Sequence, residues 1–327
     1  MLCCIHKLEI CSRQRRNGVN MYDVLIIGGG PAGMSAAVYA RRAGMNCVVL
    51  EKTGVTGGQA LYAEKVENYP GVSEVSGAEL AQNFRKNAEE LGATFEAKEA
   101  SGLEWNEDDK AINVKMSDGS VIQASNVILA MGAEHRHLGV PGEDRLKGRG
   151  VSYCATCDGA FFRDKTVCVA GGGDSAAGEA LYLSRICKKV LLIHRGSKLR
   201  AASVIQEKIK EADNIEPVLN TVIMEIEGKT RVEALRINNV ISGKISEIET
   251  DAVFIAVGMK PQTDFLADNT DIEIDDNGYI LADEGGRCGM NHVYAAGDVR
   301  KKSLRQIITA ASDGANCIKS IEEDKNK

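Results

Sequence analysis

Two cysteines separated by two residues, Cys154 and Cys157, form the segment whose chemistry is easiest to define. A C-x-x-C segment brings two sulfurs within disulfide reach across one turn, and it favours a thiolate nucleophile near neutral pH. Asp158 follows directly and can donate or accept the proton of a departing thiolate. The alternatives are half of a zinc site or two unlinked cysteines. Zinc needs two more ligands at a second characteristic spacing, and we find none, so we predict a redox dithiol and no metal site.

A glycine-rich turn near the start of the chain reads Gly28-x-Gly30-x-x-Gly33 and fits the dinucleotide-binding fingerprint. The first glycine allows a tight turn, the second lets the backbone approach a pyrophosphate, and the third lets the helix meet the strand. Glu51 lies 23 positions after Gly28. A carboxylate there accepts hydrogen bonds from ribose hydroxyls, although it could also be a solvated charge at a strand end. We predict that this turn binds a dinucleotide, with its phosphates at the helix N-terminus.

A second turn reads G-x-G-x-x-A from Gly171 to Ala176, the variant with alanine in third place. The position 23 residues after Gly171 holds His194 instead of an acid, and Arg195 and Arg200 follow it. A carboxylate at this place would repel a 2′-phosphate, whereas guanidinium groups bind one with charge-assisted hydrogen bonds. The alternative is an ordinary solvated basic cluster. We predict that this second site takes NADPH.

The elements that position both turns repeat one plan: a strand, a glycine-rich turn, a helix and a second strand. Their ranges are 22–27, 31–44 and 46–50 in the first copy, and 166–170, 175–186 and 190–193 in the second. Each copy continues into a hairpin, at 111–123 or 231–248, and then into a buried strand that ends in Gly132 or Gly258. Two copies of one plan predict two dinucleotide-binding domains.

The C-terminal segment is too short to form a third domain. It contains predicted strands over 278–281 and 293–296, then Asp298, then a predicted helix over 303–321. We infer that this segment returns to complete the first domain. The sequence therefore predicts an α/β fold of two Rossmann-like, three-layer ββα domains, the second inserted into the first. The predicted boundaries are 21–136 with 262–327 for the first domain, and 137–261 for the second.

The composition excludes several classes of protein. A net charge of −6 with interspersed charges argues against a nucleic-acid partner. No apolar run approaches the roughly 18 residues of a membrane span. No secretory signal is visible, so the ten cysteines indicate the reducing cytoplasm, with Cys47, Cys168 and Cys187 as core residues. Residues 1–20 match no periodic pattern and are expected to be a disordered extension; the alternative is a metal-binding or redox tail using Cys3 and Cys4.

Several short segments together resemble one known family. Their order and spacing are similar to those of the low-molecular-weight bacterial and archaeal thioredoxin reductases over residues 21–318. The segments are Gly28-Gly-Gly-Pro-Ala-Gly33, Gly57-Gly58-Gln59, Val66-Glu67-Asn68-Tyr69-Pro70-Gly71, Gly139-Val-Pro-Gly-Glu143, Cys154-Ala-Thr-Cys-Asp158, Gly171-Gly-Gly-Asp-Ser175 and Ala295-Ala-Gly-Asp-Val299 with Arg305-Gln306. This family also has the insertion topology, with FAD in the first domain and the pyridine nucleotide and dithiol in the second.

The resemblance implies roles for individual residues. Cys157 would face the flavin, Cys154 would attack the disulfide of thioredoxin, and Asp158 would be the acid–base group. The second domain would rotate, so that nicotinamide and dithiol take turns at the flavin. The implied FAD contacts are Gly28, Gly30, Pro31, Ala32, Gly33, Glu51, Gly58, Gln59, Asn68, Gly132, Gly297, Asp298, Arg305, Gln306 and Ile307. The implied NADPH contacts are Gly171, Gly173, Asp174, Ser175, His194, Arg195, Arg200 and Gly258.

One departure from the family concerns the electron donor. NADPH-selective members read His-Arg-Arg-x-x-x-Arg, whereas this chain has Gly196 in place of the second arginine. NADH is therefore an alternative donor. Relatives that have lost the nucleotide motifs use ferredoxin, but Gly171, Gly173 and Ala176 are intact here, so a nucleotide is favoured over reduced ferredoxin. Another small dithiol protein is an alternative acceptor. A ferredoxin–NADP oxidoreductase-like or regulatory flavoprotein with inert cysteines is a further alternative, but such relatives generally lack the C-x-x-C. The resemblance implies thioredoxin as partner and a homodimer as assembly.

Overall fold

A computed structural model describes residues 15–16, 19–63, 65–73, 75–108, 110–266 and 271–325. The chain divides into two compact units: unit 1 is Met1–Glu134 with Pro261–Lys327, and unit 2 is His135–Lys260. Two short strands on the connecting segments, β8 (Ala133–His135) and β17 (Met259–Pro261), pair with each other. Most of the predicted extension 1–20, with Cys3 and Cys4, lies outside the described residues.

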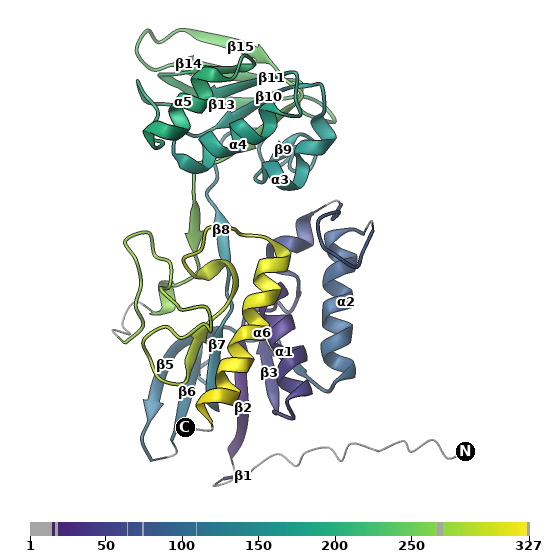
Figure 1. The fold of residues 1–327 in the computed structure, drawn as a ribbon, viewed down its shortest axis with the longest axis vertical. Helices are drawn as coiled ribbons and strands as arrows, with labels where there is room; N and C mark the ends of the chain where they lie inside the picture. The colour runs from purple at the N-terminus through teal and green to yellow at the C-terminus, as the bar shows by residue number, and fades with distance from the viewer. Residues whose placement is uncertain are drawn as a thin grey trace, which may run out of the picture. The chain divides into compact units, whose positions relative to one another are not determined.

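Unit 1 is built on a parallel sheet in the order β4-β3-β2-β7, with β18 on the far side of β7. Strand β7 is shared, because its first half also pairs antiparallel with β6, which pairs with β5 (Figure 1). The strands are β1 (Arg15–Arg16), β2 (Val19–Ile27), β3 (Cys47–Leu50), β4 (Thr94–Glu96), β5 (Ala100–Asn106), β6 (Ala111–Met116), β7 (Val121–Leu129) and β18 (Val293–Ala295). The helices are α1 (Pro31–Arg42), α2 (Gly77–Glu90) and α6 (Ile307–Asp324), with short 3₁₀ turns η1 (Gly58–Tyr62), η3 (Asp264–Leu266) and η4 (Gly297–Val299).

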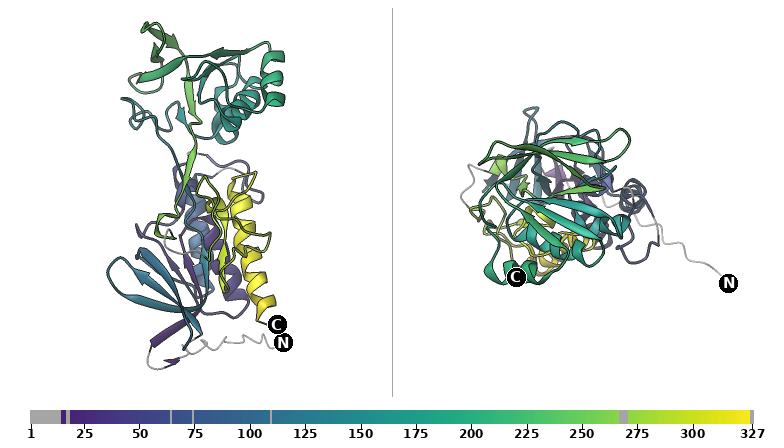
Figure 2. Two further views of the ribbon diagram at one scale, coloured as in Figure 1. Left: turned by 90° about the vertical axis from the view of Figure 1, so that its left-hand side faces the viewer. Right: turned by 90° about the horizontal axis from the view of Figure 1, so that it is seen from above.

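Strands β3 and β18 and the second halves of β2 and β7 are buried on both faces, which explains their continuous apolar runs. Successive side chains of β2 alternate: Val24 and Ile26 pack with the helices α1 and α6, whereas Leu25 and Ile27 pack with the meander β5–β7. The helices and the outer strands of the meander lie on opposite sides of the parallel sheet (Figures 1 and 2). Unit 1 is therefore a three-layer structure.

The C-terminal helix α6 packs directly on α1, although the two are far apart in the chain (Figure 1). Close approach depends on small residues: a Cβ on Gly314 of α6 would overlap the carbonyl oxygen of Ala32 in α1. The hydroxyl of Ser35 donates to the Ala311 carbonyl oxygen at 2.7 Å. The C-terminal segment thus completes unit 1.

Unit 2 repeats this plan with a parallel sheet in the order β12-β11-β10-β16-β9 and an antiparallel meander β13-β14-β15. Val167 and Val169 of β10 face the helical side, whereas Cys168 and Ala170 face the meander. The strands are β9 (Val151–Ser152), β10 (Thr166–Ala170), β11 (Lys189–Ile193), β12 (Ile215–Val218), β13 (Thr221–Glu227), β14 (Ala234–Asn239), β15 (Ile245–Glu249) and β16 (Ala252–Ile255). The helices are α3 (Ala155–Asp158), α4 (Asp174–Ser184) and α5 (Ser203–Glu211), with the 3₁₀ turn η2 (Gly159–Phe162).

The predicted fold class is confirmed, since parallel sheets of the dinucleotide-binding type occur in both units. Four local predictions were wrong. The first long strand begins at Val19, not at position 22, and Arg15–Arg16 pairs with its start. Residues 278–281 form no strand and contribute only isolated bridges at Ile280. The buried strand predicted to end in Gly132 is not separate from the hairpin before it, because β7 runs without a break from Val121 to Leu129. Helix α6 begins at Ile307, not at position 303, because the Gln306 side chain caps it.

Candidate active site

The first glycine-rich turn joins β2 to α1 and requires two of its glycines. Gly28 has φ +112°, and a Cβ there would overlap the carbonyl oxygen of Ala130. A Cβ on Gly33 would overlap the carbonyl oxygen of Gly28, so helix and turn touch backbone to backbone. Gly30 differs, because apart from its own atoms and its chain neighbours no atom of the described residues lies within 4 Å of the place where its Cβ would be. The turn therefore leaves open space at the N-terminus of α1, where Pro31 and Ala32 begin the helix.

Glu51 stands at the end of β3 beside this turn. One carboxylate oxygen accepts the N–H of Gly29 at 3.0 Å, and the other accepts the N–H and hydroxyl of Thr53 at 3.2 and 3.1 Å. These bonds fix the carboxylate at the edge of the turn. A further hydrogen bond holds the same loop in place: the N–H of Gly57 donates to the Gly29 carbonyl oxygen at 2.8 Å. Gly58 and Gln59 follow in η1 and are exposed.

Three buried polar atoms in the segment before α6 have no hydrogen-bond partner among the described residues. They are Oδ1 of Asp298 and the Nε atoms of Arg300 and Arg305. Burial raises the pKa of Asp298, while Lys302 and Arg305 oppose that rise. The Arg305 guanidinium lies 4.3 Å from the centre of the Tyr279 ring. Buried polar groups without partners are rare in folded proteins, so these atoms fit contacts with a polar ligand.

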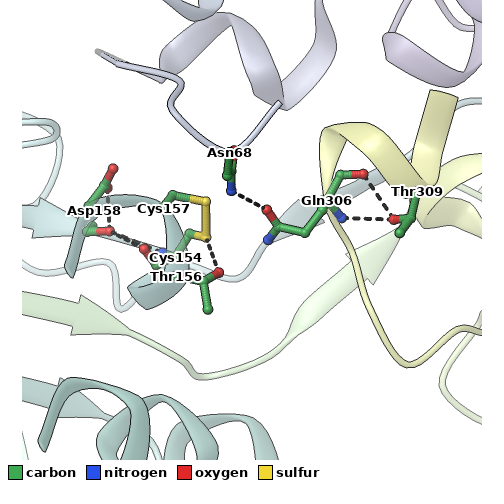
Figure 3. The surroundings of a disulfide bond; sticks show 8 residues. Asn68, Cys154, Thr156, Cys157, Asp158, Gln306 and Thr309 are labelled. Atoms are coloured by element: carbon green, nitrogen blue, oxygen red, sulfur yellow. Dashed lines mark hydrogen bonds between the residues drawn. A yellow bond between two sulfur atoms is a disulfide. The ribbon is translucent and has the colours of Figure 1, made fainter. Parts of the chain in front are cut away.

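Asn68 and Gln306, 238 positions apart, meet in a side-chain hydrogen bond: the amide of Asn68 donates to Gln306 Oε1 at 2.9 Å (Figure 3). Gln306 also caps α6 in a reciprocal bond with Thr309, and Ile307 is the first residue of that helix. Gly132, with φ +71°, lies just after β7 and has open space at its Cβ position. Gly297 has φ +79° and opens η4, which carries Asp298.

The second glycine-rich turn joins β10 to α4 in the same way. Gly171 has φ +153°, and a Cβ there would overlap the Ala256 carbonyl oxygen, whereas Gly173 faces open space. The Asp174 carboxylate accepts the N–H of Ala202 at 2.7 Å and so ties the start of α4 to the start of α5. Ser175 is exposed on the first turn of α4.

His194 occupies the position that Glu51 holds in unit 1, but it makes different contacts. Its buried ring lies against both Gly172, where a Cβ would overlap it, and Gly196, where a Cβ would be 2.9 Å from Nε2. Burial, followed by the nearby Arg200 and Arg195, lowers the pKa of His194. Both arginine side chains are exposed. Gly258 lies after β16 with φ +113°.

The dithiol is closed as a disulfide between Cys154 and Cys157, with 5.3 Å between their Cα atoms (Figure 3). Cys154 caps the short helix α3, and its carbonyl oxygen accepts the N–H groups of Cys157 at 3.2 Å and Asp158 at 3.1 Å. Thr156 Oγ1 lies 3.4 Å from Cys154 Sγ. The predicted pairing is therefore confirmed, and the two sulfurs are not unlinked.

Sequence reasoning missed Ser152, which precedes Cys154 by two residues. Its hydroxyl donates to Asp158 Oδ2 at 2.6 Å and accepts the N–H of Cys154 at 3.1 Å. Only the small polar side chain next to the C-x-x-C hinted at this contact. The other described cysteines are buried thiols whose pKa burial raises; they are Cys47, Cys168, Cys187, Cys288 and Cys317. The predicted core positions of the first three are confirmed.

Among the described residues, no helix combines the length and the apolar character that crossing a membrane requires.

Comparisons with known proteins agree over nearly the whole chain. The model of the family called pyridine nucleotide-disulphide oxidoreductase matches residues 22–314. Thioredoxin reductase of Treponema pallidum is 45% identical over 295 residues, which cover 90% of this chain and 94% of that protein. Thioredoxin reductase of Bacillus subtilis is 41% identical over 303 residues, covering 92% and 94%. The crystal structure of thioredoxin reductase from Streptococcus pyogenes has a TM-score of 0.87 at 40% identity, covering 94% of this chain and 98% of that one.

Proposed function

Because this chain belongs to the pyridine nucleotide-disulphide oxidoreductase family and is a thioredoxin reductase within it, we propose that it carries electrons from NADPH through FAD to the Cys154–Cys157 pair and on to thioredoxin. The disulfide in α3 is the single observation that carries this proposal. It supplies a group that can be reduced on one side and can reduce a second disulfide on the other.

Unit 1 would hold FAD. The open turn at Gly30 would receive the pyrophosphate, the fixed carboxylate of Glu51 would bind ribose hydroxyls, and Asp298 and Arg305 would find the polar partners that they lack. Bound FAD would supply two-electron transfer between a nicotinamide and a disulfide. Asp298→Ala should lower the flavin retained per chain, measured by absorbance, while the exposed Asp276→Ala should not. Equal flavin content in both variants would contradict the assignment of Asp298.

Unit 2 would bind NADPH at its glycine-rich turn, with Arg195 and Arg200 on the 2′-phosphate. Each hydrogen bond to a charged group contributes about 1.5–3 kcal/mol, so Arg195→Ala or Arg200→Ala should lower kcat/KM for NADPH roughly tenfold to a hundredfold. The values for NADH should hardly change, and the exposed Lys208→Ala serves as a control. Anaerobic flavin reduction by NADPH, NADH and reduced ferredoxin tests the donor directly. Reduction by ferredoxin alone would rule out the pyridine-nucleotide assignment.

Within the dithiol, Cys154 would attack the thioredoxin disulfide, Cys157 would exchange electrons with the flavin, and Asp158 would hold the proton. This order follows the family resemblance, since Cys154 and Cys157 are both partly exposed and exposure alone does not distinguish them. Cys157→Ser should trap a mixed disulfide with oxidised thioredoxin, because no second thiol can resolve it. Cys154→Ser should trap none. Trapping by Cys154→Ser alone would reverse the two roles.

We also propose a homodimer working in the cytoplasm, in line with the family resemblance. Light scattering on the flavin-bound protein should give about twice the mass of one 35.1 kDa chain. A monomer at micromolar concentration would contradict the dimer.

A further inference from the structure

Ser152 makes the hydrogen bonds that connect the acid–base group to the attacking cysteine. It ends β9, two residues before Cys154, and its side chain is 5% exposed. Its hydroxyl donates to Asp158 Oδ2 at 2.6 Å and accepts the N–H of Cys154 at 3.1 Å. A second acceptor, the carbonyl oxygen of Cys154, lies 3.4 Å away. A hydroxyl has one proton to donate, so these two acceptors compete for it.

The direction of the bond depends on the charge of Asp158. The shorter contact to a carboxylate oxygen is charge-assisted and stabilises the ionised form. If Oδ2 of Asp158 takes up a proton, that oxygen becomes a donor and the serine hydroxyl can turn to the carbonyl oxygen of Cys154. The serine can therefore satisfy both protonation states, but it favours the carboxylate.

The surroundings hold this serine in place. Ser152 pairs in the parallel ladder with Phe254 of β16. The next residue, Tyr153, donates its hydroxyl to the buried Glu143 at 2.6 Å, and Glu143 also accepts the N–H groups of Leu138 and Gly139 at 3.2 and 2.8 Å. A strand fixed on both sides of Ser152 keeps the hydroxyl within reach of Asp158.

We propose that Ser152 is a positioning residue for the thiol–disulfide exchange, acting by stabilising the carboxylate form of Asp158 after it has given up its proton; this rests on the proposed role of Asp158. In the step concerned, the Cys154 thiolate attacks a sulfur of the thioredoxin disulfide. A Cys154–thioredoxin disulfide forms, the thioredoxin disulfide breaks, and the leaving thiolate takes the proton of Asp158. The Cys157 thiolate then attacks Cys154 Sγ. The Cys154–Cys157 disulfide forms, the Cys154–thioredoxin disulfide breaks, and the second thioredoxin sulfur leaves as a thiolate that takes up a proton from solvent. The Ser152 hydroxyl binds the carboxylate that the first transfer creates.

The test compares Ser152→Ala with wild type over pH 5–9, using thioredoxin reduction as the readout. Without the hydroxyl, Asp158 becomes a weaker acid. Because thioredoxin reduction requires protonated Asp158, its rate should fall at high pH along the alkaline limb of the pH profile. In Ser152→Ala this limb should move to higher pH by about one unit, and the rate on the plateau below it should fall about threefold to tenfold. Flavin reduction by NADPH, measured by rapid mixing, should stay at the wild-type rate and reports that unit 2 is folded. Ser184→Ala removes a hydroxyl that bonds only the Leu181 carbonyl oxygen among the contacts described, and should leave the limb in place.

A double-variant cycle separates the two proposals. Asp158→Asn should abolish the limb, and Ser152→Ala should then cause no further loss, because both changes act on one group. Ser152→Thr, which keeps a hydroxyl, should restore the wild-type limb. A plateau loss without a shifted limb, or additive losses in the double variant, would overturn the role of Ser152 alone. A limb that survives in Asp158→Asn would overturn the role of Asp158 itself and this inference with it.

Discussion

The two glycine-rich turns share one backbone frame and differ in the side chains around it. Counting from Gly28 and Gly171, the third position of the motif is Gly33 in unit 1 and Ala176 in unit 2. The strand-end position is Glu51 in one and His194 in the other. Glu51 accepts an N–H of its turn, whereas the ring of His194 packs against its turn and leaves the arginines beside it exposed.

This difference separates what the fold needs from what the ligand needs. The first glycine recurs in both units because a Cβ at Gly28 or Gly171 would overlap a backbone carbonyl oxygen. The second glycine also recurs, but a Cβ at Gly30 or Gly173 would meet open space, so the fold itself does not require glycine there. The strand-end residue varies, as the proposed sites would require if it faces the ribose of whichever nucleotide binds. The same frame can thus serve two dinucleotides, and it becomes an enzyme because unit 2 also carries the dithiol.

The largest expected effect comes from removing that dithiol. Cys154→Ser and Cys157→Ser should each lower thioredoxin reduction by on the order of a thousandfold or more, since both sulfurs are needed to form a disulfide. Flavin reduction by NADPH should remain, because it uses the two nucleotide sites only. Rapid mixing with NADPH measures flavin reduction, and steady-state assays measure thioredoxin reduction. Cys187→Ala, which removes a buried thiol of unit 2, is the control and should keep both activities.

The next effect tests the third motif position. Gly33→Ala places a Cβ on the Gly28 carbonyl oxygen and should lower the free energy of unfolding by about 2 kcal/mol, with loss of bound flavin. The reverse change in unit 2, Ala176→Gly, should lower it by only about 1 kcal/mol, from the helix propensity of glycine. For each variant, urea unfolding measures the free energy of unfolding, and absorbance measures the flavin bound per chain. If Gly33→Ala retained full flavin, the close contact of helix and turn would not matter for the site.

A smaller effect concerns Gly196, which corresponds to Thr53 in unit 1. Gly196→Arg adds a guanidinium for the 2′-phosphate, but its Cβ must displace the His194 ring, which already lies against Gly172. We therefore expect kcat/KM for NADPH to rise by less than about tenfold, below the full worth of a charged hydrogen bond. Gly196→Ala adds the Cβ without a guanidinium, so it should lower kcat/KM for NADPH. NADH serves as the control donor, and a gain for NADH in Gly196→Arg would contradict the phosphate assignment.

The sequence was sufficient for the turns, the dithiol and the two-unit α/β fold, because each has a spacing dictated by backbone geometry. Among the elements it missed are β5 and β13, and both carry a register shift, between Ala100 and Gly102 and between Ile223 and Glu225. A bulge breaks the alternation of apolar and polar residues on which strand prediction depends. The Ser152–Asp158 bond depends on the folded structure, and so does the lack of partners for Asp298 and Arg305 within the described part of the chain. No local sequence pattern predicts either feature.

The smallest expected effect lies on the helix after each turn, where Ala36 of α1 corresponds to Glu179 of α4. Ala36 is fully buried, whereas Glu179 has a buried Oε2 without a hydrogen-bond partner among the described residues. Burial raises the pKa of Glu179 from 4.5 to about 7. The folded chain therefore binds this proton more tightly than the unfolded chain, and stability falls as pH rises from about 4.5 to about 7.

Glu179→Gln keeps the shape and removes the charge, so its effect on stability should depend on pH. At pH 5 the variant and wild type should unfold at nearly the same urea concentration, whereas at pH 8 the variant should be more stable by about 2 kcal/mol, after allowance for partial solvent screening. Glu207→Gln on the exposed face of α5 is the matched control and should change neither value. An equal gain at both pH values would mean that packing, not the buried charge, distinguishes α4 from α1. A gain confined to pH 8 would mean that unit 2 keeps a destabilising carboxyl where unit 1 has alanine, as expected where binding of a polar ligand matters more than stability.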